Sequence, residues 1–298
     1  LSPEQLAQII RTARRSFRMA GDTEVTIEAS PENVTPETAT AWAKTGINRV
    51  SMGVQSWDEE LLKTLGRVHS GTQARRSYEI LREAGVPNVN LDLIFGIPGQ
   101  DRGQWIESLR QTVALDPDHI SAYCLTYEED TEYFERFRRG ELVPVTETDA
   151  DFFEVAMDTL EQAGYRQYEI SNYAKPGREC LHNLGYWRGS DYAGFGPSAV
   201  STRGGWRRKN LADTEAYTQR VLTGGDRFET LERLDAETLR FESLSLGLRT
   251  REGVPSDSFD EGRLRTLAAH GFVGISDGRV TLTRQGRVVA DQVTTELL

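Results

Sequence analysis

The amino-acid sequence predicts an α/β fold built from repeated strand–helix units. Strand-like runs recur four times in the first half of the chain, at residues 24–28, 48–54, 88–94 and 118–125. Amphipathic stretches that fit helices separate them, at residues 36–44, 58–65, 72–84 and 104–115. Gly46 and Gly85 each follow one of these stretches, at the place where a helix commonly ends. Units that alternate in this way predict a parallel sheet or barrel.

Three of the expected strands carry a polar face. Strands of a parallel sheet are usually apolar on both faces, because both faces are buried. Here apolar residues alternate with polar ones, and the polar faces end at Glu28, Gln55 and Asp92. Barrel enzymes bind their ligands at the carboxyl ends of their strands. We therefore expect a ligand site on this face; the alternative is a water-filled polar lumen with no specific ligand.

The side chains at these strand ends suit a small polar ligand. Glu28 stands just before Pro31, which stops the strand, and its carboxylate can accept hydrogen bonds from both hydroxyls of a ribose. Gly53 lets a ligand approach the backbone closely, and Gln55 offers a donor and an acceptor. Arg67 is a fixed cation that can meet a ligand carboxylate, although a surface ion pair explains it equally well.

The second half of the chain follows a different pattern. A long amphipathic helix is expected at 148–163, then short aromatic β-like pieces at 165–173, 186–187 and 192–201, then helices at 213–222 and 236–248. The tail predicts a helix at 262–269, a hairpin turning at Asp277-Gly278, and a last helix at 284–293. This tail resembles a winged-helix module, with a small core expected from five residues: Leu264, Leu267, Phe272, Val280 and Leu282.

Composition excludes several classes of protein. The net charge of −11 disfavours nucleic acid as a partner. The two cysteines, Cys124 and Cys180, are far apart, so we expect two core residues and neither a disulfide framework nor a zinc site. The first twenty residues do not form a signal peptide, and no apolar run approaches the roughly 18 residues of a membrane span. A cytoplasmic location is the default expectation, and peripheral contact with a membrane stays open.

Several strings of residues, in order along the chain, resemble one known family. They are Glu28 before Pro31, Arg-x-Ser-x-Gly-x-Gln-Ser at 49–56, Leu-Gly-Arg-x-His at 65–69, and Asp-Leu-x-x-Gly-x-Pro-Gly-Gln at 92–100. The match continues through 169–174 and 178–187 into the C-terminal module. The chain is similar to the family of radical S-adenosylmethionine proteins that contains oxygen-independent coproporphyrinogen III oxidases and heme chaperones. A 4Fe–4S cluster and S-adenosylmethionine are the cofactors that this resemblance implies.

The resemblance also implies roles for individual residues. Glu28 would contact the ribose of S-adenosylmethionine, and Gln55, Arg67 and Asp92 would make further contacts around it. His182, Tyr186 and Trp187 are similar to a heme-associated string of the chaperones, with His182 as a possible ligand of heme iron. Without the resemblance, a structural histidine in an aromatic corner explains this string.

The implied architecture has three parts. They are a partial (β/α)6 barrel over 1–145, which lacks its first strands, an α+β extension over 146–230 and the winged-helix-like module over 231–298. The family's CxxxCxxC cluster motif is absent from these 298 residues, and Leu1 is followed directly by the helix-cap sequence Ser2-Pro3. We therefore expect a fragment that binds no cluster, cleaves no S-adenosylmethionine and exposes a barrel edge at 24–28.

Three smaller departures from the family pattern also bear on function. Ser198 and Val200 replace a Gly and a His of the run at 194–201, and Ser30 stands where Asn is usual. The loss of that His puts any part that it plays in catalysis or heme binding in doubt.

Three functions compete on this basis. The first is a heme chaperone that holds heme near His182 and passes it to an acceptor, which the sequence does not identify. The second is oxidative decarboxylation of coproporphyrinogen III, whose distinguishing residues would lie mostly before Leu1. The third is a binding module that acts through the C-terminal arginines, where a lid or docking role fits better than nucleic acid: Arg263, Arg265, Arg279, Arg284 and Arg287. The string at 182–187 favours the chaperone.

Overall fold

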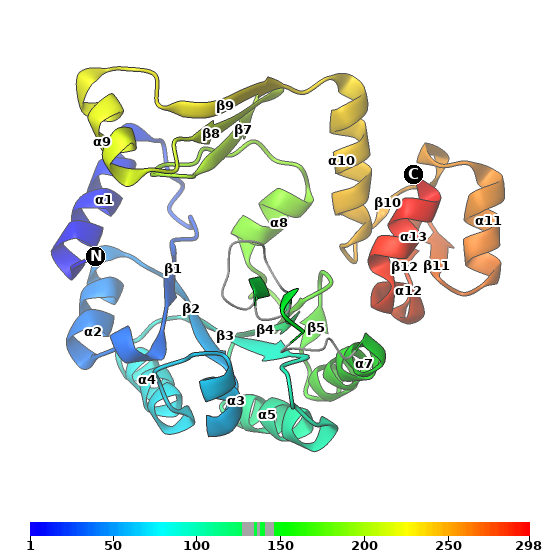
Figure 1. Ribbon diagram of the computed structural model, residues 1–298, viewed down its shortest axis with the longest axis horizontal. Coiled ribbons are helices and arrows are strands. Elements are labelled where there is room, and N and C mark those ends of the chain that lie inside the picture. Colours follow the sequence, from blue (N-terminus) through cyan, green and yellow to red (C-terminus); the bar gives the residue numbers. More distant parts are fainter. Residues whose placement is uncertain (127–133, 136–137, 141–145) are drawn as a thin grey trace. The chain divides into compact units, whose positions relative to one another are not determined.

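The computed structural model describes residues 1–126, 134–135, 138–140 and 146–298 (Figure 1). The chain divides into two compact units, Leu1–Glu179 and Cys180–Leu298, and each is described here by itself. The three-part division predicted from the sequence, with boundaries at 145/146 and 230/231, stays a prediction.

The first unit is built on a six-stranded sheet with the order β1-β2-β3-β4-β6-β5. Its strands are β1 (Thr26–Ala29), β2 (Arg49–Gln55), β3 (Asn88–Phe95), β4 (His119–Cys124), β5 (Arg166–Gln167) and β6 (Asn172–Ala174). Strands β1 to β4 run parallel, whereas β6 runs antiparallel to both β4 and β5. The four parallel strands confirm the predicted α/β class. Among the described residues β1 pairs with β2 alone, so it forms one edge of the sheet.

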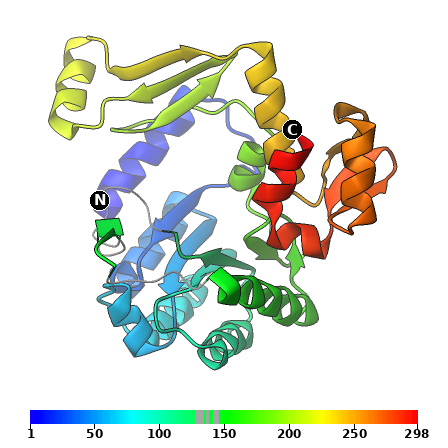
Figure 2. The same cartoon turned by 45° about the vertical axis from the view of Figure 1, so that its right-hand side comes forward.

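Helices cover one side of this sheet, as Figures 1 and 2 both show. They are α2 (Pro36–Thr45), α3 (Glu59–Thr64), α4 (Gly71–Glu83), α5 (Arg102–Ala114) and α7 (Thr146–Gln162), with the short η1 (Pro31–Asn33) after β1. The apolar residues of β2, β3 and β4 on this side are fully buried, among them Val50, Met52, Leu91, Leu93 and Ile120. Burial of such side chains is the main stabilising term of the unit. The polar residues of the same strands are left for the other side.

The first helix, α1 (Pro3–Ser16), starts as its sequence predicts. The Ser2 side chain accepts a hydrogen bond from the Gln5 backbone N–H, and the Gln5 side chain accepts one from the backbone of Ser2 in return. Pro3 occupies the first helical position, where its missing N–H leaves no intrahelical bond unmade.

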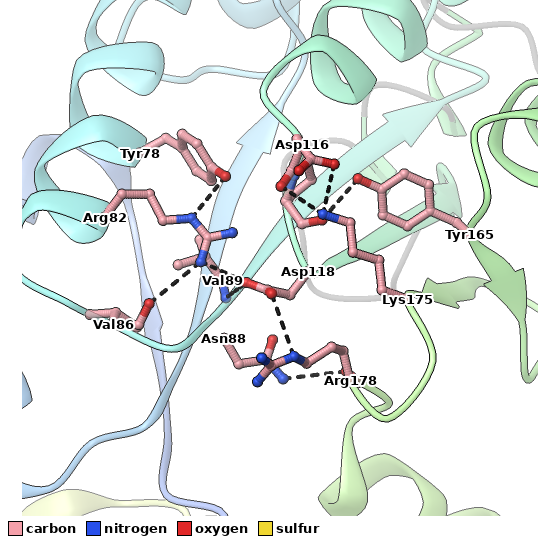
Figure 3. Close-up of polar contacts among 11 residues, drawn as sticks. Tyr78, Arg82, Val86, Asn88, Val89, Asp116, Asp118, Tyr165, Lys175 and Arg178 are labelled. Atoms are coloured by element: carbon pink, nitrogen blue, oxygen red, sulfur yellow. Dashed lines mark hydrogen bonds and ion pairs between the residues drawn. The ribbon is translucent and has the colours of Figure 1, made fainter.

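An ion-pair cluster lies at the amino ends of β3 and β4, away from the strand ends predicted to bind a ligand (Figure 3). Asp118, just before β4, accepts a hydrogen bond of 3.0 Å from the Val89 backbone N–H of β3. Its carboxylate also lies 2.7 Å from Nη1 of Arg82 and 3.6 Å from Nε of Arg178. Nearby, Lys175 pairs with Asp116 at 2.6 Å. The cluster ties α4 to the sheet, and its position indicates a role in stability.

The second unit begins with α8 (Leu181–Trp187) and a three-stranded antiparallel sheet of β7 (Val200–Arg203), β8 (Trp206–Asn210) and β9 (Phe228–Arg233). Helix α9 (Thr214–Thr223) connects β8 to β9, and α10 (Ala236–Leu248) follows. The C-terminal module contains β10 (Val254–Pro255), η2 (Ser256–Ser258), α11 (Glu261–Ala269), β11 (Val273–Ser276), β12 (Arg279–Leu282), α12 (Arg284–Val288) and α13 (Ala290–Leu297). Its sheet has the order β10-β12-β11, and its winged-helix character stays a prediction.

Several local predictions are wrong. Residues 186–187 were expected to be β-like but end helix α8, and the expected last helix is broken at Val289 into α12 and α13. In the small C-terminal core Phe272 is only half-buried, and Val273 takes the buried position. Cys124 is exposed at the end of β4, whereas Cys180 is buried as expected. The hairpin turn is confirmed, with Asp277 and Gly278 both at positive φ.

Ser198 occupies a backbone conformation that favours glycine. Its φ is 59°, in the left-handed region, at the position where the family's pattern has Gly. A non-glycine residue in this region carries a strain of roughly 1 kcal/mol. We expect Ser198→Gly to raise the free energy of unfolding of the second unit by about 1 kcal/mol, measured by urea titration.

The matched control for this prediction is Ser201→Gly in β7. The Ser201 hydroxyl accepts a hydrogen bond of 2.9 Å from the Gly194 backbone N–H, so this change should destabilise the protein. Equal effects of the two changes would contradict the assignment of strain to Ser198.

Candidate functional site

The polar side of the first unit's sheet, called here the inner face, gathers side chains from neighbouring strands. The strand register places Glu28 of β1 beside Ser51 of β2, Ser51 beside Asn90 of β3, and Asn90 beside His119 of β4. One row further toward the carboxyl ends, Gly53, Asp92 and Ser121 are neighbours in the same way. The predicted polar face therefore exists and extends onto β4.

A continuous hydrogen-bond network links these residues. The Asn90 Nδ2 donates to Asp92 Oδ1 at 2.7 Å and to Ser51 Oγ at 2.7 Å. The Ser51 hydroxyl donates to Asp92 Oδ2 at 3.0 Å. On its other side, Asn90 Oδ1 lies 2.6 Å from Nδ1 of His119 and accepts from the Ser121 hydroxyl at 3.2 Å. Nε2 of His119 lies 2.8 Å from the hydroxyl of Tyr168.

Burial determines the charge state of this network. His119 is completely buried, which together with the Arg49 cation holds its pKa well below the usual value, so the imidazole is neutral at pH 7. Burial raises the pKa of Asp92, while hydrogen bonds from Ser121, Asn90 and Ser51 oppose that shift. Asp92 nevertheless keeps some exposure on the inner face. It is therefore a hydrogen-bonded carboxyl group that is only partly exposed on the inner face.

Gln55 reaches the inner face by way of a bulge. The pairing of β2 with β3 shifts between Gly53 and Gln55, and Gln55 has a φ of 65°, which is unusual for a residue with a side chain. A Cβ added at Gly53 would lie 2.7 Å from Nε2 of Gln55. The Gln55 amide is thus folded over Gly53, next to the row that contains Asp92. Strain of this kind commonly accompanies a functional site.

Glu28 and Arg67 are both exposed. Glu28 lies near the carboxyl end of β1, on the same face as Ser51. Arg67 lies in the turn after α3, where its backbone N–H donates to the Leu62 carbonyl, and within the described residues it contacts none of the other three predicted S-adenosylmethionine residues. The structure therefore brings Glu28, Gln55 and Asp92 onto one face and leaves Arg67 apart.

His69 anchors the turn that carries Arg67. It is buried, and its Nε2 lies 3.1 Å from the Val54 carbonyl at the bulge of β2. Its Nδ1 lies 3.5 Å from a carboxylate oxygen of Glu32, in the η1 turn after β1. His69 therefore fastens together the segments that follow β1 and β2, which is a structural role.

Arg49 is a buried cation on the inner face, at the start of β2. It is 3% exposed, and its Nε is buried without a hydrogen-bond partner in the described part of the chain. Its charge opposes the burial-driven rise in the pKa of Asp92 and adds to the fall in the pKa of His119. Arg49 thus helps to keep the carboxyl group ionised and the imidazole neutral.

In the second unit, α8 presents an aromatic cluster. His182 and Tyr186 lie one turn apart on the helix, with ring centroids 4.7 Å apart and nearly perpendicular planes, and Tyr192 packs on Tyr186 in the same way. His182 and Tyr186 are exposed. Trp187 instead lies against the guanidinium of Arg249, at the end of α10, 5.5 Å from its ring centroid. Two of the three predicted heme residues share a face, and Tyr192 joins them.

The cysteines do not fit an iron–sulfur cluster. Such a cluster is held by thiolates, and the 298 residues contain only two cysteines. Although Cys124 is exposed overall, partial desolvation of its thiol and the neighbouring Asp149 raise its pKa to about 12, so the thiol is protonated, and Cys180 is buried in the other unit. No group of three or more His, Cys, Asp or Glu residues able to hold a metal occurs in the described ranges.

Sequence reasoning overlooked His119, Ser121 and Tyr168. The first two were detectable, because His119, Ser121 and Tyr123 alternate with apolar residues in β4 as the polar residues do in β2 and β3. Tyr168 comes from the segment between β5 and β6, 49 residues further along the chain. No local pattern connects it with this face.

Comparisons with known proteins agree on one family. A family model described as the radical SAM superfamily matches residues 2–112. A heme chaperone HemW from Bacillus subtilis is 35% identical over 306 residues, which cover 98% of this chain and 81% of that protein. A heme chaperone HemW from Mycobacterium tuberculosis is 38% identical over 304 residues, covering 100% and 77% of the two chains.

A solved structure has the same fold. It is the coproporphyrinogen III oxidase HemN from Escherichia coli, a radical SAM enzyme, with a TM-score of 0.84 over 99% of this chain and 74% of that chain. Its sequence identity is 21%, so this likeness concerns the fold and not the reaction.

Proposed function

This chain belongs to the heme chaperone HemW family of radical SAM proteins, and from that premise we propose that it binds S-adenosylmethionine on the inner face of its first unit and heme at α8. The observation that carries the first part is the convergence of Glu28, Gln55 and Asp92 on one face. Two carboxylates and an amide supply acceptors for ribose hydroxyls and for an ammonium group, together with one amide donor. Arg67 is the fourth proposed contact.

The residues present fit the nucleoside part of S-adenosylmethionine. Gly53 leaves room above the backbone, Gln55 fills part of it with an amide, and Asp92 points its carboxyl group to the same side. When bound with a cluster, S-adenosylmethionine would supply radical chemistry, but the cluster ligands are not among these residues. We therefore assign this chain binding and orientation of the cofactor and no reaction step.

Replacing Gly53 with alanine tests the S-adenosylmethionine site. The added methyl group would stand 2.7 Å from Nε2 of Gln55 and displace that flexible amide, while the fold accommodates the change. We expect Gly53→Ala to weaken binding of S-adenosylmethionine at least about tenfold in equilibrium dialysis, the effect expected when one hydrogen bond between the amide and a charged group of the ligand is broken. Gly21→Ala is the control, since a methyl group there meets nothing within 4 Å. Equal affinities of the two variants would remove Gln55 from the site.

Heme is the proposed cargo of the second unit. His182 offers an exposed imidazole, the usual protein ligand of heme iron, and Tyr186 and Tyr192 supply ring surface beside it. Trp187 was predicted to take part, but it is held by Arg249, so we assign it to the support of α8. The acceptor to which the heme is transferred stays unidentified.

The His182→Ala variant tests heme binding. We expect it to lose the shift of the heme absorption band that the unchanged chain produces with hemin, and to bind hemin at least about tenfold more weakly, because the iron loses its protein ligand. His270→Ala is a matched control, because His270 is also an exposed histidine of the second unit. Equal hemin binding by both variants would exclude His182 as the ligand.

No observation favours the oxidase over the chaperone. The fold is shared with HemN, but at 21% identity that likeness does not transfer the reaction. A C-terminal nucleic-acid module has no structural support either. Three of its arginines bind carboxylates or backbone carbonyls nearby, namely Arg263, Arg265 and Arg279. No helix in the described residues is both long and apolar enough to span a bilayer.

A further inference from the structure

We infer that His119 is a positioning residue of the S-adenosylmethionine site: held between Asn90 and Tyr168 with its proton on Nδ1, it orients Asn90 and, through Asn90, the carboxyl group of Asp92. This inference rests on the proposed role of Asp92 as a cofactor contact. The two residues that it adds, His119 and Tyr168, were identified neither by the sequence motifs nor by the family resemblance.

The directions of the hydrogen bonds follow from the ionised form of Asp92, which its hydrogen bonds and the Arg49 cation favour against burial. Asp92 Oδ1 accepts, so the atom of Asn90 that lies 2.7 Å from it must be the amide nitrogen. The amide oxygen of Asn90 then faces His119, and the 2.6 Å contact requires a proton on Nδ1 of the imidazole. Because the buried imidazole is neutral, its Nε2 carries no proton and accepts from the Tyr168 hydroxyl at 2.8 Å.

Burial makes this order difficult to change. Asn90, His119 and Tyr168 are each no more than 1% exposed, so water cannot replace a lost partner. If the imidazole took its other tautomer, the lone pair of Nδ1 would face the amide oxygen of Asn90 at 2.6 Å. That repulsion would favour rotation of the Asn90 amide, which would turn its oxygen toward Asp92. The Tyr168 hydroxyl can donate to Nε2 or accept from it, so the contact of Nδ1 with Asn90 is what couples the tautomer of His119 to the orientation of Asp92.

The orientation of the Asp92 carboxyl group depends on the residues that donate hydrogen bonds to it. Its two oxygens accept from Asn90 and Ser51, and it remains partly exposed on the inner face. With both hydrogen bonds in place, each oxygen keeps a further lone pair that can accept from a ligand. A carboxyl group that is free to rotate would lose this preorganisation. Part of the binding free energy of the ligand would then be used to order the carboxyl group.

Two substitutions of His119 separate positioning from simple packing. In His119→Asn the amide nitrogen takes the place of Nδ1 and can still donate to Asn90, whereas in His119→Gln the amide nitrogen takes the place of Nε2 and cannot. Both are uncharged, and circular dichroism checks that both fold. We expect the Gln variant to bind S-adenosylmethionine about tenfold more weakly, and the Asn variant to stay within about threefold of the unchanged chain. Equal losses in the two variants would overturn the inference.

The tautomer can be observed without any cofactor. The chain has four histidines, so long-range ¹H–¹⁵N correlation spectra contain only four imidazole patterns, and the His119 variants assign one of them. We expect the His119 pattern to show a protonated Nδ1 and an unprotonated Nε2, because the contact with Asn90 requires the proton on Nδ1. A proton on Nε2 in the unchanged chain would contradict the inference.

The two measurements also separate this inference from the proposed function. If the unchanged chain failed to bind S-adenosylmethionine, the proposed cofactor site would be wrong, and the spectra would still decide which nitrogen of His119 carries the proton. If binding were strong but indifferent to Gln at position 119, the site would stand and the positioning role of His119 would be lost.

Discussion

Asp118→Ala should lower the free energy of unfolding of the first unit by about 3 kcal/mol, since it breaks a buried ion pair and leaves a buried backbone donor unsatisfied. Asp118 is 8% exposed and binds Arg82 at 2.7 Å and the Val89 N–H at 3.0 Å (Figure 3). After its removal the guanidinium of Arg82 keeps the Tyr78 hydroxyl as a partner at 2.9 Å, but no carboxylate. A urea titration monitored by tryptophan fluorescence measures the change in the free energy of unfolding.

Two variants make this prediction specific. Asp118→Asn keeps an oxygen for the Val89 N–H and loses only the charge, so its cost should be roughly half as large. Asp116→Asn removes the neighbouring ion pair with Lys175, but the Asp116 side chain is 80% exposed, and exposed pairs contribute at most about 1 kcal/mol. Asn also tolerates the positive φ of 55° at this position. A loss for Asp118→Ala no larger than that for Asp116→Asn would show that burial does not decide the strength of the cluster.

The sequence predicted the parts of the fold that depend on local pattern. Helix α10 was placed at its observed bounds, 236–248, and the polar faces of β2 and β3 followed from strict alternation. The same rule placed Gln55 on the polar face, and its amide does lie there. It does so through a bulge and a positive φ, however, which no period-two pattern contains. The position of the side chain was predictable, and the backbone that delivers it was not.

Strands β8 and β9 were missed because their residues are mostly polar and charged. Arg207, Arg208 and Lys209 in β8 have low strand propensity, and tertiary pairing overrides it. One signal was nevertheless present: Gly204-Gly205 joins β7 to β8 with both residues at positive φ, as a two-residue hairpin turn requires. The prediction of a β-like piece at 186–187 was wrong for the opposite reason. Aromatic residues favour strands, but here they complete a short helix.

The buried side chains next to the candidate site could not be predicted as a group from the sequence, for a different reason. Asn90 and Asp92 were recognised as sharing a face, because they lie two residues apart in one strand. The contact of His119 with Tyr168 joins residues 49 positions apart and depends on β6 pairing antiparallel with β4. Neither the register nor the direction of that pairing can be read from the sequence of β4 or β6 alone.

His119 should also make the stability of the first unit depend on pH. Its pKa in the folded protein lies well below the usual value of about 6.5, because the site is buried and Arg49 adds a positive charge. Below pH 6.5 the His119 imidazole therefore binds a proton in the unfolded chain but not in the folded chain. Stability then falls as the pH decreases below 6.5, by at most about 1.4 kcal/mol per pH unit for one proton.

The other groups that face His119 do not produce this effect. Arginine and tyrosine side chains ordinarily titrate far above that range, so neither Arg49 nor Tyr168 is expected to contribute. Asp92 reaches His119 through Asn90, and its raised pKa acts with the opposite sign, because stability is then lost as the pH rises through the acidic range. Urea titrations of the unchanged chain and of His119→Asn, from pH 7.5 to 5.0, isolate the histidine by difference. The difference between the two curves should change steadily below pH 6.5; parallel curves would mean that the folded protein accepts the proton at position 119.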